Sequence, residues 1–272
     1  MSGRRLTTAP KAVHMQHGTQ VAPGAAGNWF VYPRRNPTAT LQLICFASAG
    51  HGPAMFRPWV ALLPPHVELA IAHLPGRESR WNEPPLTRMA DVADLLTAAL
   101  VPGLDRPFAL FGHSLGALAA FEVAQRLVSR GIVPVHVFAS AHRAPQRPNR
   151  HPRVSDLPDR EFAAQVNARH GGIPEAVAQN RELMELMLPS LRADYRIFED
   201  YVYVDRPPLP CPLTAFAGRA DSHVCQDDVE PWRAQTAGPF TFQVFEGGHF
   251  FINDRRSDVV ATILQALPLQ RA

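Results

Sequence analysis

Short apolar runs alternate with helix-like segments along most of the chain. β-branched and aromatic runs predict strands at 41–47, 67–73, 107–112, 134–140, 212–217 and 240–246. Between several of them, helical stretches fall near 55–63, 88–101, 115–130, 227–236 and 256–266. Strands that alternate with helices are typical of a mainly parallel sheet covered on both faces. The pattern therefore predicts an α/β fold.

One interval departs from this alternation. Residues 141–211 contain no convincing strand, but helical patterns appear near 158–169 and 180–201. A helical insertion between two sheet strands indicates a lid at about 155–200. The alternative is an ordinary crossover with extra helices.

The beginning of the chain has a different character. Residues 1–38 lack periodicity and contain no acidic residue, so we expect a flexible N-terminal extension there. Within it, Trp29–Tyr32 is a candidate for a first edge strand. The 272 residues then divide into this extension and one domain over residues 39–272.

A Gly-x-Ser-x-Gly pattern stands between a predicted strand and a predicted helix. The stretch reads Phe108-Ala-Leu-Phe-Gly-His-Ser-Leu-Gly-Ala117. This order of strand, sharp turn and helix is typical of a nucleophile elbow, which exposes a serine hydroxyl above the sheet. Ser114 is therefore the candidate nucleophile. His113 adjoins it, and we expect its ring to pack beneath the turn.

A serine needs a base, and the base needs an acid that orients it; in this fold they follow in the order Ser, Asp or Glu, His. His249 follows the strand predicted at 240–246 and a Gly-Gly pair, so it is the candidate base. Asp221 follows the strand at 212–217 and is the candidate acid. Asp227 and Asp228 compete with it, but they open the next helix, where acids commonly cap. His223 is expected to be a loop histidine.

The oxyanion hole of such a site uses two backbone N–H groups. Leu115, directly after the nucleophile, supplies the first. The loop Ala47-Ser48-Ala49-Gly50-His51-Gly52 follows an early strand and is expected to supply the second, for which we favour Ala49 over Gly50. A simple glycine-rich loop is the alternative.

Composition excludes several classes of protein. Hydrophobic residues make up 46% and charged residues 19% of the chain, which argues against global disorder. The net charge of +3 comes from scattered arginines, with Lys11 the one lysine, and no nucleic-acid-binding signature appears. Three cysteines without a Cys-x-x-Cys motif, and no long apolar segment, predict a soluble cytoplasmic protein. No zinc, Walker A or dinucleotide motif is present, so no metal or cofactor is expected.

Taken together, these motifs resemble the type II thioesterases of nonribosomal-peptide and polyketide assembly lines. The resemblance covers most of the chain after residue 41. It rests on Phe46-Ala-Ser-Ala-Gly50, Phe56-Arg-Pro-Trp59, Leu74-Pro-Gly-Arg77, Glu83-Pro-Pro-Leu86, Phe111-Gly-His-Ser-Leu-Gly116, Gly171-Gly-Ile-Pro174, Leu188-Pro-Ser-Leu-Arg-Ala-Asp194, Tyr201, Gly218, Asp221, Trp232 and Gly247-Gly-His-Phe250.

The resemblance implies an α/β-hydrolase fold and a triad of Ser114, Asp221 and His249. It also implies oxyanion donors on Leu115 and on the early loop. The implied activity is hydrolysis of acyl or aminoacyl thioesters from the phosphopantetheine arm of carrier proteins, by a monomer without a cofactor of its own. One departure is that Ala47 and Ser48 stand where the family usually has Pro and His or Tyr. The alternatives are a general small-ester esterase or lipase, and a catalytically idle subunit that docks carrier proteins.

Overall fold

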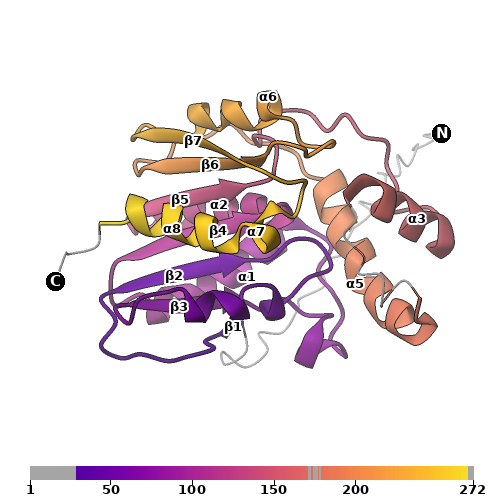
Figure 1. The fold of residues 1–272 in the computed structure, drawn as a ribbon, viewed down its shortest axis with the longest axis horizontal. Helices are drawn as coiled ribbons and strands as arrows, with labels where there is room; N and C mark the ends of the chain where they lie inside the picture. Colours follow the sequence, from indigo (N-terminus) through magenta and orange to yellow (C-terminus); the bar gives the residue numbers. More distant parts are fainter. Residues whose placement is uncertain (1–28, 171–172, 174–176, 178, 269–272) are drawn as a thin grey trace, which may run out of the picture.

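Six parallel strands and one antiparallel edge strand form a sheet through the middle of the molecule (Figure 1). The computed structural model describes residues 29–170, 173, 177 and 179–268. Along the sheet the strand order is β1-β3-β2-β4-β5-β6-β7, and only β1 pairs antiparallel, with β3. The strands are β1 Phe30–Val31, β2 Leu41–Phe46, β3 Val67–Ala72, β4 Phe108–His113, β5 His136–Ser140, β6 Leu213–Gly218 and β7 Phe240–Phe245.

All six strands predicted from the apolar runs are present, which confirms the α/β prediction. Every residue of β2, β3, β4, β5 and β6 is buried, as expected for a parallel sheet covered on both faces. β1 confirms the edge strand predicted at Trp29–Tyr32. Residues 1–28 of the predicted extension lie outside the described residues.

Helices cover the sheet from two sides (Figure 1). On one side, α1 (Met89–Leu100) and α2 (Leu115–Val128) share a core with α6 (Gln226–Val229). On the other side, α8 (Arg256–Ala266) packs with α7 (Phe251–Asp254) and the Trp59 turn. Because alternate residues of a strand point to opposite faces, Ile44 joins the first core and Leu43 the second.

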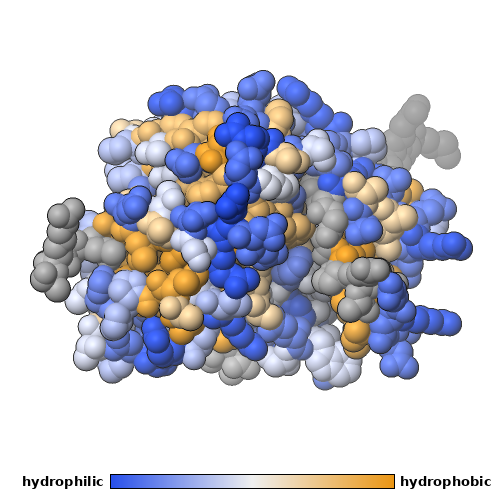
Figure 2. Space-filling model, viewed as in Figure 1, coloured by the Kyte–Doolittle hydropathy of each residue, from blue (hydrophilic) through white to orange (hydrophobic). Residues whose placement is uncertain are grey.

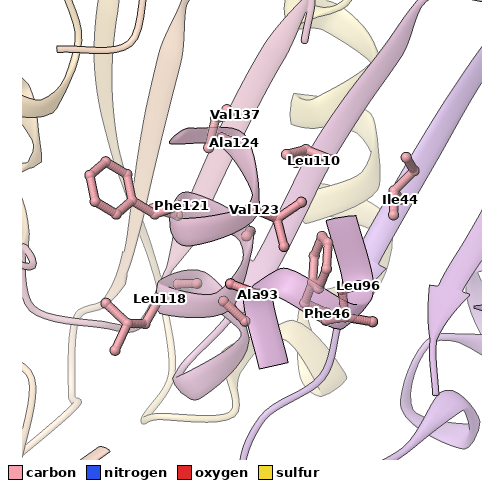
Figure 3. Close-up of a cluster of buried hydrophobic side chains, with 14 of the residues drawn as sticks. Ile44, Phe46, Ala93, Leu96, Leu110, Leu118, Phe121, Val123, Ala124 and Val137 are labelled. Carbon is pink, nitrogen blue, oxygen red and sulfur yellow. The ribbon is translucent and has the colours of Figure 1, made fainter. Parts of the chain in front are cut away.

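The central part of the first core packs α1 and α2 against β2, β4 and β5. Figure 3 shows side chains of α2 packed beside those of α1, β2, β4 and β5. This packing fixes the position of α2, whose first residue directly follows Ser114. The labelled residues are Ile44, Phe46, Ala93, Leu96, Leu110, Leu118, Phe121, Val123, Ala124 and Val137.

Two predicted helices are largely 3₁₀ turns. The stretch predicted at 55–63 forms the turns Pro53–Met55 and Arg57–Ala61, and 227–236 is split into α6 and the turn Glu230–Gln235. Each 3₁₀ turn has a proline at its first or second position. Proline lacks the N–H that the interior of an α-helix needs, so it is tolerated only at the start of a helix. In these stretches it limits the helix to a short 3₁₀ turn.

Among the described residues, the interval between β5 and β6 contains two helices that lie beside the sheet, at the right of Figure 1. They are α3 (Asp159–His170) and α5 (Arg181–Glu199). Asn180 caps α5 by accepting hydrogen bonds from the N–H groups of Glu182 and Leu183. Phe162, Leu191 and neighbouring residues form a separate small core between the two helices. We call α3 and α5 the lid.

The outer edge of the lid is hydrophilic in the view of Figure 2. Within the described part of the chain, none of the helices combines the length and the apolar character that crossing a membrane requires.

Candidate active site

Ser114 sits at a sharp turn between β4 and α2. Its φ of 55° lies in a region that non-glycine residues rarely adopt, so the backbone here is strained. The Ser114 N–H donates to the Ser140 carbonyl (2.7 Å), and the Ser114 carbonyl accepts from the Ala117 N–H (2.9 Å). These hydrogen bonds hold the turn and confirm the elbow predicted from the Gly-x-Ser-x-Gly pattern.

The two glycines of the pattern are required by close backbone contacts. A Cβ on Gly112 would lie 2.0 Å from the Gly116 carbonyl oxygen, and a Cβ on Gly116 would lie 2.0 Å from the Phe46 carbonyl oxygen. Neither contact can be relieved by a side-chain rotation, because the obstructing atoms belong to the backbone. The turn therefore depends on both glycines, and it brings β2 and its following loop against the start of α2.

His249 reaches Ser114 from the loop after β7. Its Nε2 lies 3.0 Å from the Ser114 Oγ, and its Nδ1 lies 2.7 Å from the Asp221 Oδ2. A carboxylate can only accept, so the proton of neutral His249 is on Nδ1 and the Ser114 hydroxyl donates to Nε2. Gly247 makes this loop possible, because its φ of +124° is a conformation that other residues rarely adopt.

Asp221 is buried after β6 and holds His249 in place. Its Oδ1 accepts from the N–H groups of His223 (3.0 Å) and Val224 (3.1 Å), while Oδ2 faces His249. Burial would raise the pKa of Asp221, but hydrogen bonds from His249 and from the two backbone N–H groups lower it below its ordinary value. The carboxylate is therefore ionised at neutral pH, as an orienting acid requires.

The structure separates the competing residues from this hydrogen-bonded chain. Asp227 and Asp228 lie in the first turn of α6, as predicted, but Cys225 is the N-cap and no side chain caps the helix; Asp228 accepts from the Cys225 thiol. The His223 ring lies beside Ser222 and His151, away from Ser114. His113 is buried under the turn, where its Nδ1 lies 2.9 Å from the Ser140 Oγ.

The loop after β2 lies beside the nucleophile. Ala49, Leu115, Ser114 and His249 line the same cavity. Leu115 is the first residue of α2, so its N–H has no acceptor within the helix. This N–H lies at the positive end of the helix dipole. In the early loop, the Gly50 N–H donates to Asp194 (2.7 Å) and the His51 N–H donates to Ser48 (3.0 Å). With both of these donors used, Ala49 is the better candidate for the second oxyanion donor, as predicted.

A buried ion pair ties this loop to the lid. Asp194 of α5 is fully buried and accepts from Arg77 Nη1 (2.8 Å) and Nη2 (3.0 Å) in a bidentate pair. Its Oδ2 also accepts the Gly50 N–H, and Arg77 donates to the His51 carbonyl (3.2 Å). The lid helix therefore fixes the residue next to Ala49.

Two cavities meet at the Ser114–His249 pair. The first, of about 40 Å³, has a largely apolar wall from the lid and the early loop, and we call it the apolar cavity. The second, of about 240 Å³, contains several arginines and histidines, and we call it the basic cavity. The apolar cavity is lined by Ser48, Ala49, Ser114, Leu115, Val166, Leu191, Tyr195, Phe198, His249 and Phe250.

No metal site accompanies these features in the described residues: they contain no cluster of three His, Cys, Asp or Glu side chains that could hold an ion. The residues that the sequence predicted, Ser114, Asp221, His249, Leu115 and Ala49, are all brought together. Sequence reasoning gave no role to Arg77 and Asp194, although both stand in motifs that it singled out. Their pairing across 117 positions has no signal in a single sequence.

Comparison with known proteins gives one consistent result. A family model described as a thioesterase domain matches residues 41–267. Gramicidin S biosynthesis protein GrsT of Aneurinibacillus migulanus is 36% identical over 242 residues, which cover 89% of this chain and 94% of GrsT.

Solved structures agree with that result. The type II thioesterase BorB from the borrelidin biosynthetic cluster superposes with a TM-score of 0.81 at 36% identity, covering 88% of this chain and 97% of BorB. The RedJ thioesterase from the prodiginine pathway of Streptomyces coelicolor has a TM-score of 0.79 at 38% identity, covering 84% and 91% respectively. These neighbours share the α/β-hydrolase architecture described above.

Proposed function

The chain belongs to the thioesterase family and is a hydrolase that acts on thioesters, and we propose that its substrates are acyl or aminoacyl groups on the phosphopantetheine arms of carrier proteins. In this proposal it is a type II thioesterase, which removes misprimed or stalled groups from a nonribosomal-peptide or polyketide assembly line. The observation that carries the proposal is the Ser114–His249–Asp221 hydrogen-bonded chain, set in a fold shared with BorB and RedJ.

The proposed reaction begins with acylation of the serine. His249 Nε2 accepts the Ser114 proton as Oγ attacks the thioester carbonyl carbon. Asp221 stabilises the resulting imidazolium and keeps its orientation. The tetrahedral intermediate then collapses, the C–S bond breaks, and His249 returns the proton to the departing thiolate sulfur. The products of this half are an acyl-Ser114 ester and a free thiol on the arm.

Hydrolysis of the acyl-enzyme follows with the same residues. His249 takes a proton from a water molecule, whose oxygen attacks the Ser114 ester. Collapse of the second intermediate releases the carboxylic acid and returns the proton to Ser114. The N–H groups of Leu115 and Ala49 would hold the negative oxygen in both intermediates, and loss of one such donor typically costs ~10²–10³ in rate. The triad itself supplies the nucleophile and base, so the proposal includes no cofactor.

The rival functions make different demands on the site. A general esterase would act on small oxygen esters without a carrier, whereas the named relatives are thioesterases and biosynthetic proteins. An idle docking subunit would have no need of the strained backbone at Ser114, which costs on the order of 1–3 kcal/mol. Both features support the thioesterase proposal.

The test compares three substrates: an acetyl-loaded carrier protein, acetyl-pantetheine and p-nitrophenyl acetate. We expect the highest kcat/KM for the loaded carrier, and its loss in Ser114→Ala. Ser257→Ala is the matched control, because it makes the same change at an exposed position outside the site and should retain wild-type rates. Equal or faster cleavage of the oxygen ester by the wild type would contradict the proposal.

A further inference from the structure

The basic cavity concentrates cationic side chains next to the nucleophile. It reaches Ser114 and His249 at its inner end, and its wall comes from the segment after β5, the end of α3 and the loop after β6. The positively charged or titratable groups in this wall are Arg143, Arg150, Arg169, His142, His151 and His223.

Hydrogen bonds between the segments hold this wall together. Arg169 at the end of α3 donates to the Pro152 carbonyl (2.9 Å), and His151 Nε2 lies 3.2 Å from the His223 carbonyl oxygen. The rings of His151 and His223 pack together with centroids 5.3 Å apart, and burial and the charges of His151 and Arg169 lower the pKa of His223. These contacts join the end of α3, the segment after β5 and the loop after β6.

The three arginines in this wall form no ion pair among the described residues, although the charge of Asp228 raises the pKa of Arg143. Within the described residues, no carboxylate oxygen lies within 4.0 Å of the guanidinium nitrogens of Arg143, Arg150 or Arg169. Asp228 is the acidic side chain in the wall, and its Oδ2 accepts from the Cys225 thiol. Arginines between β5 and β6 that lie outside the cavity behave differently, since Arg153 and Arg192 both pair with carboxylates.

The three arginines are placed at different depths. Arg143 is half-buried, donates to the Arg147 carbonyl and lies over the Phe198 ring, and burial lowers its pKa to about 10. Arg150 is exposed, and Arg169 is half-buried. Arg150 and Arg169 are thus available to an anionic group that enters the cavity, whereas the Arg143 guanidinium already donates to a backbone carbonyl.

We propose that the basic cavity binds the phosphate at the 4′ end of a pantetheine arm, with Arg150 and Arg169 as its ligands. The assignment rests on the proposed function, because a long arm that places its thioester at Ser114 must leave its phosphate toward the mouth. Guanidinium groups match phosphate oxygens with charge-assisted, often bidentate hydrogen bonds. The acyl group then occupies the apolar cavity on the other side of Ser114.

The experiment measures kcat/KM for acetyl-phosphopantetheine and for acetyl-pantetheine, which differ only in the phosphate. In the wild type we expect the phosphorylated substrate to be favoured by roughly tenfold. Arg150→Gln and Arg169→Gln should each reduce this ratio about three- to tenfold. A defect in folding would lower both rate constants and leave the ratio unchanged.

Two controls isolate the phosphate contact. Arg160→Gln removes the same charge from an exposed position on α3 and should keep the wild-type ratio. Arg169→Lys keeps the charge but not the planar fork, and should restore part of the ratio. A wild-type ratio near one, or an equal effect of Arg160→Gln, would overturn the assignment.

Two further arms separate this assignment from the proposed function. Calorimetry measures the binding of free phosphopantetheine and free pantetheine without turnover. We expect the wild type to bind phosphopantetheine more tightly than pantetheine, and the Arg150 and Arg169 variants to bind the two compounds equally. Equal binding of the two compounds by the wild type would overturn the phosphate site. A loaded carrier protein and acetyl-CoA both contain this phosphate, so they distinguish the two possible substrates. The Arg150 and Arg169 variants should lower kcat/KM for whichever of the two the enzyme hydrolyses. If the variants lower kcat/KM for neither substrate, the phosphate site is also overturned. Failure of the wild type to hydrolyse any thioester would contradict the proposed function alone.

Discussion

The apolar cavity and the basic cavity differ in almost every property except that both reach Ser114. The first is narrow and bounded by Val166, Leu191 and the early loop, whereas the second is wider and lined by arginines and histidines. Tyr195 and Phe198 of α5 belong to both walls, so this one helix divides them.

The difference shows how the fold distributes its tasks. The sheet places the nucleophile, base and acid just after the ends of strands. Because these strands are hydrogen-bonded to one another in the sheet and the loops of His249 and Asp221 are joined by a hydrogen bond, the three side chains have little freedom to move. The inserted lid contributes to what surrounds them, because besides the two shared side chains its Val166 and Leu191 line the apolar cavity and its Arg169 lines the basic cavity. Variants at the shared site should therefore affect every substrate, whereas variants in one cavity should affect one part of the substrate.

The largest effect is expected at the shared site. Asp221→Asn should lower kcat by ~10³–10⁴ for all thioester substrates, because an amide in this position favours the wrong tautomer of His249. Asp227→Asn makes the same change at the exposed acid that competes with Asp221 in the sequence, and should retain activity. Steady-state kinetics of both variants test whether Asp221 is the acid that orients His249. A severe loss of kcat in Asp227→Asn alone would assign that role to Asp227 instead.

A smaller effect is expected where the lid fixes the early loop. Asp194→Asn weakens the pair with Arg77 and the bond from the Gly50 N–H. We expect kcat to fall by ~10–100-fold with little change in KM, since the Ala49 N–H acts on the transition state. Thermal unfolding should occur at a lower temperature, because breaking a buried ion pair costs about 3–5 kcal/mol.

Asp200→Asn is the matched control, since it removes an exposed acid at the end of the same helix. An Asp194→Asn enzyme that unfolds earlier but keeps its wild-type kcat, measured well below its Tm, would show that the ion pair stabilises the lid without positioning the loop.

The apolar cavity should respond in its choice of acyl group. Val166→Ala removes two methyl groups' worth of buried volume, at a cost of about 1–2 kcal/mol in stability. We expect the ratio of kcat/KM for octanoyl- over acetyl-pantetheine to rise severalfold. Val224→Ala makes the same change in the wall of the basic cavity and should leave this ratio unchanged. If both variants shift the ratio equally, the acyl group is not confined to the apolar cavity.

The smallest expected effect concerns stability and pH at the shared site. Because hydrogen bonds lower the pKa of folded Asp221 below its ordinary value of 3.8, ionised Asp221 stabilises the native state at pH values above 3.8. This contribution is lost as the pH falls through the lower, folded pKa. The free energy of unfolding, measured in urea from pH 6 to pH 3, should therefore decrease more steeply in the wild type than in Asp221→Asn. Parallel curves would contradict this.

Much of this arrangement could be predicted from the sequence because it depends on local order. The strand, turn and helix around Ser114 are encoded in ten consecutive residues, and His249 and Asp221 each follow a strand that its apolar run identifies. Parallel strands bring such positions to one edge of the sheet, so the triad follows from the fold class.

The remaining features depend on contacts between distant segments. The pair of Arg77 and Asp194 joins a loop after β3 to the lid, and the Arg169 contact with Pro152 joins the end of α3 to the segment that precedes this helix. The pattern of apolar and polar residues does not indicate such a pairing, because it would be the same whether or not the two residues were in contact. The 3₁₀ turns at Arg57–Ala61 were also missed, since their spacing of apolar residues resembles that of an α-helix.

The central claim is that Ser114 divides the substrate between the two cavities. The most direct test is a crystal structure of Ser114→Ala bound to an octanoyl-phosphopantetheine in which an amide replaces the thioester. The account predicts the carbonyl oxygen near the N–H groups of Leu115 and Ala49, the acyl chain in the apolar cavity, and the phosphate between Arg150 and Arg169. An acyl chain in the basic cavity, or a phosphate remote from both arginines, would contradict it.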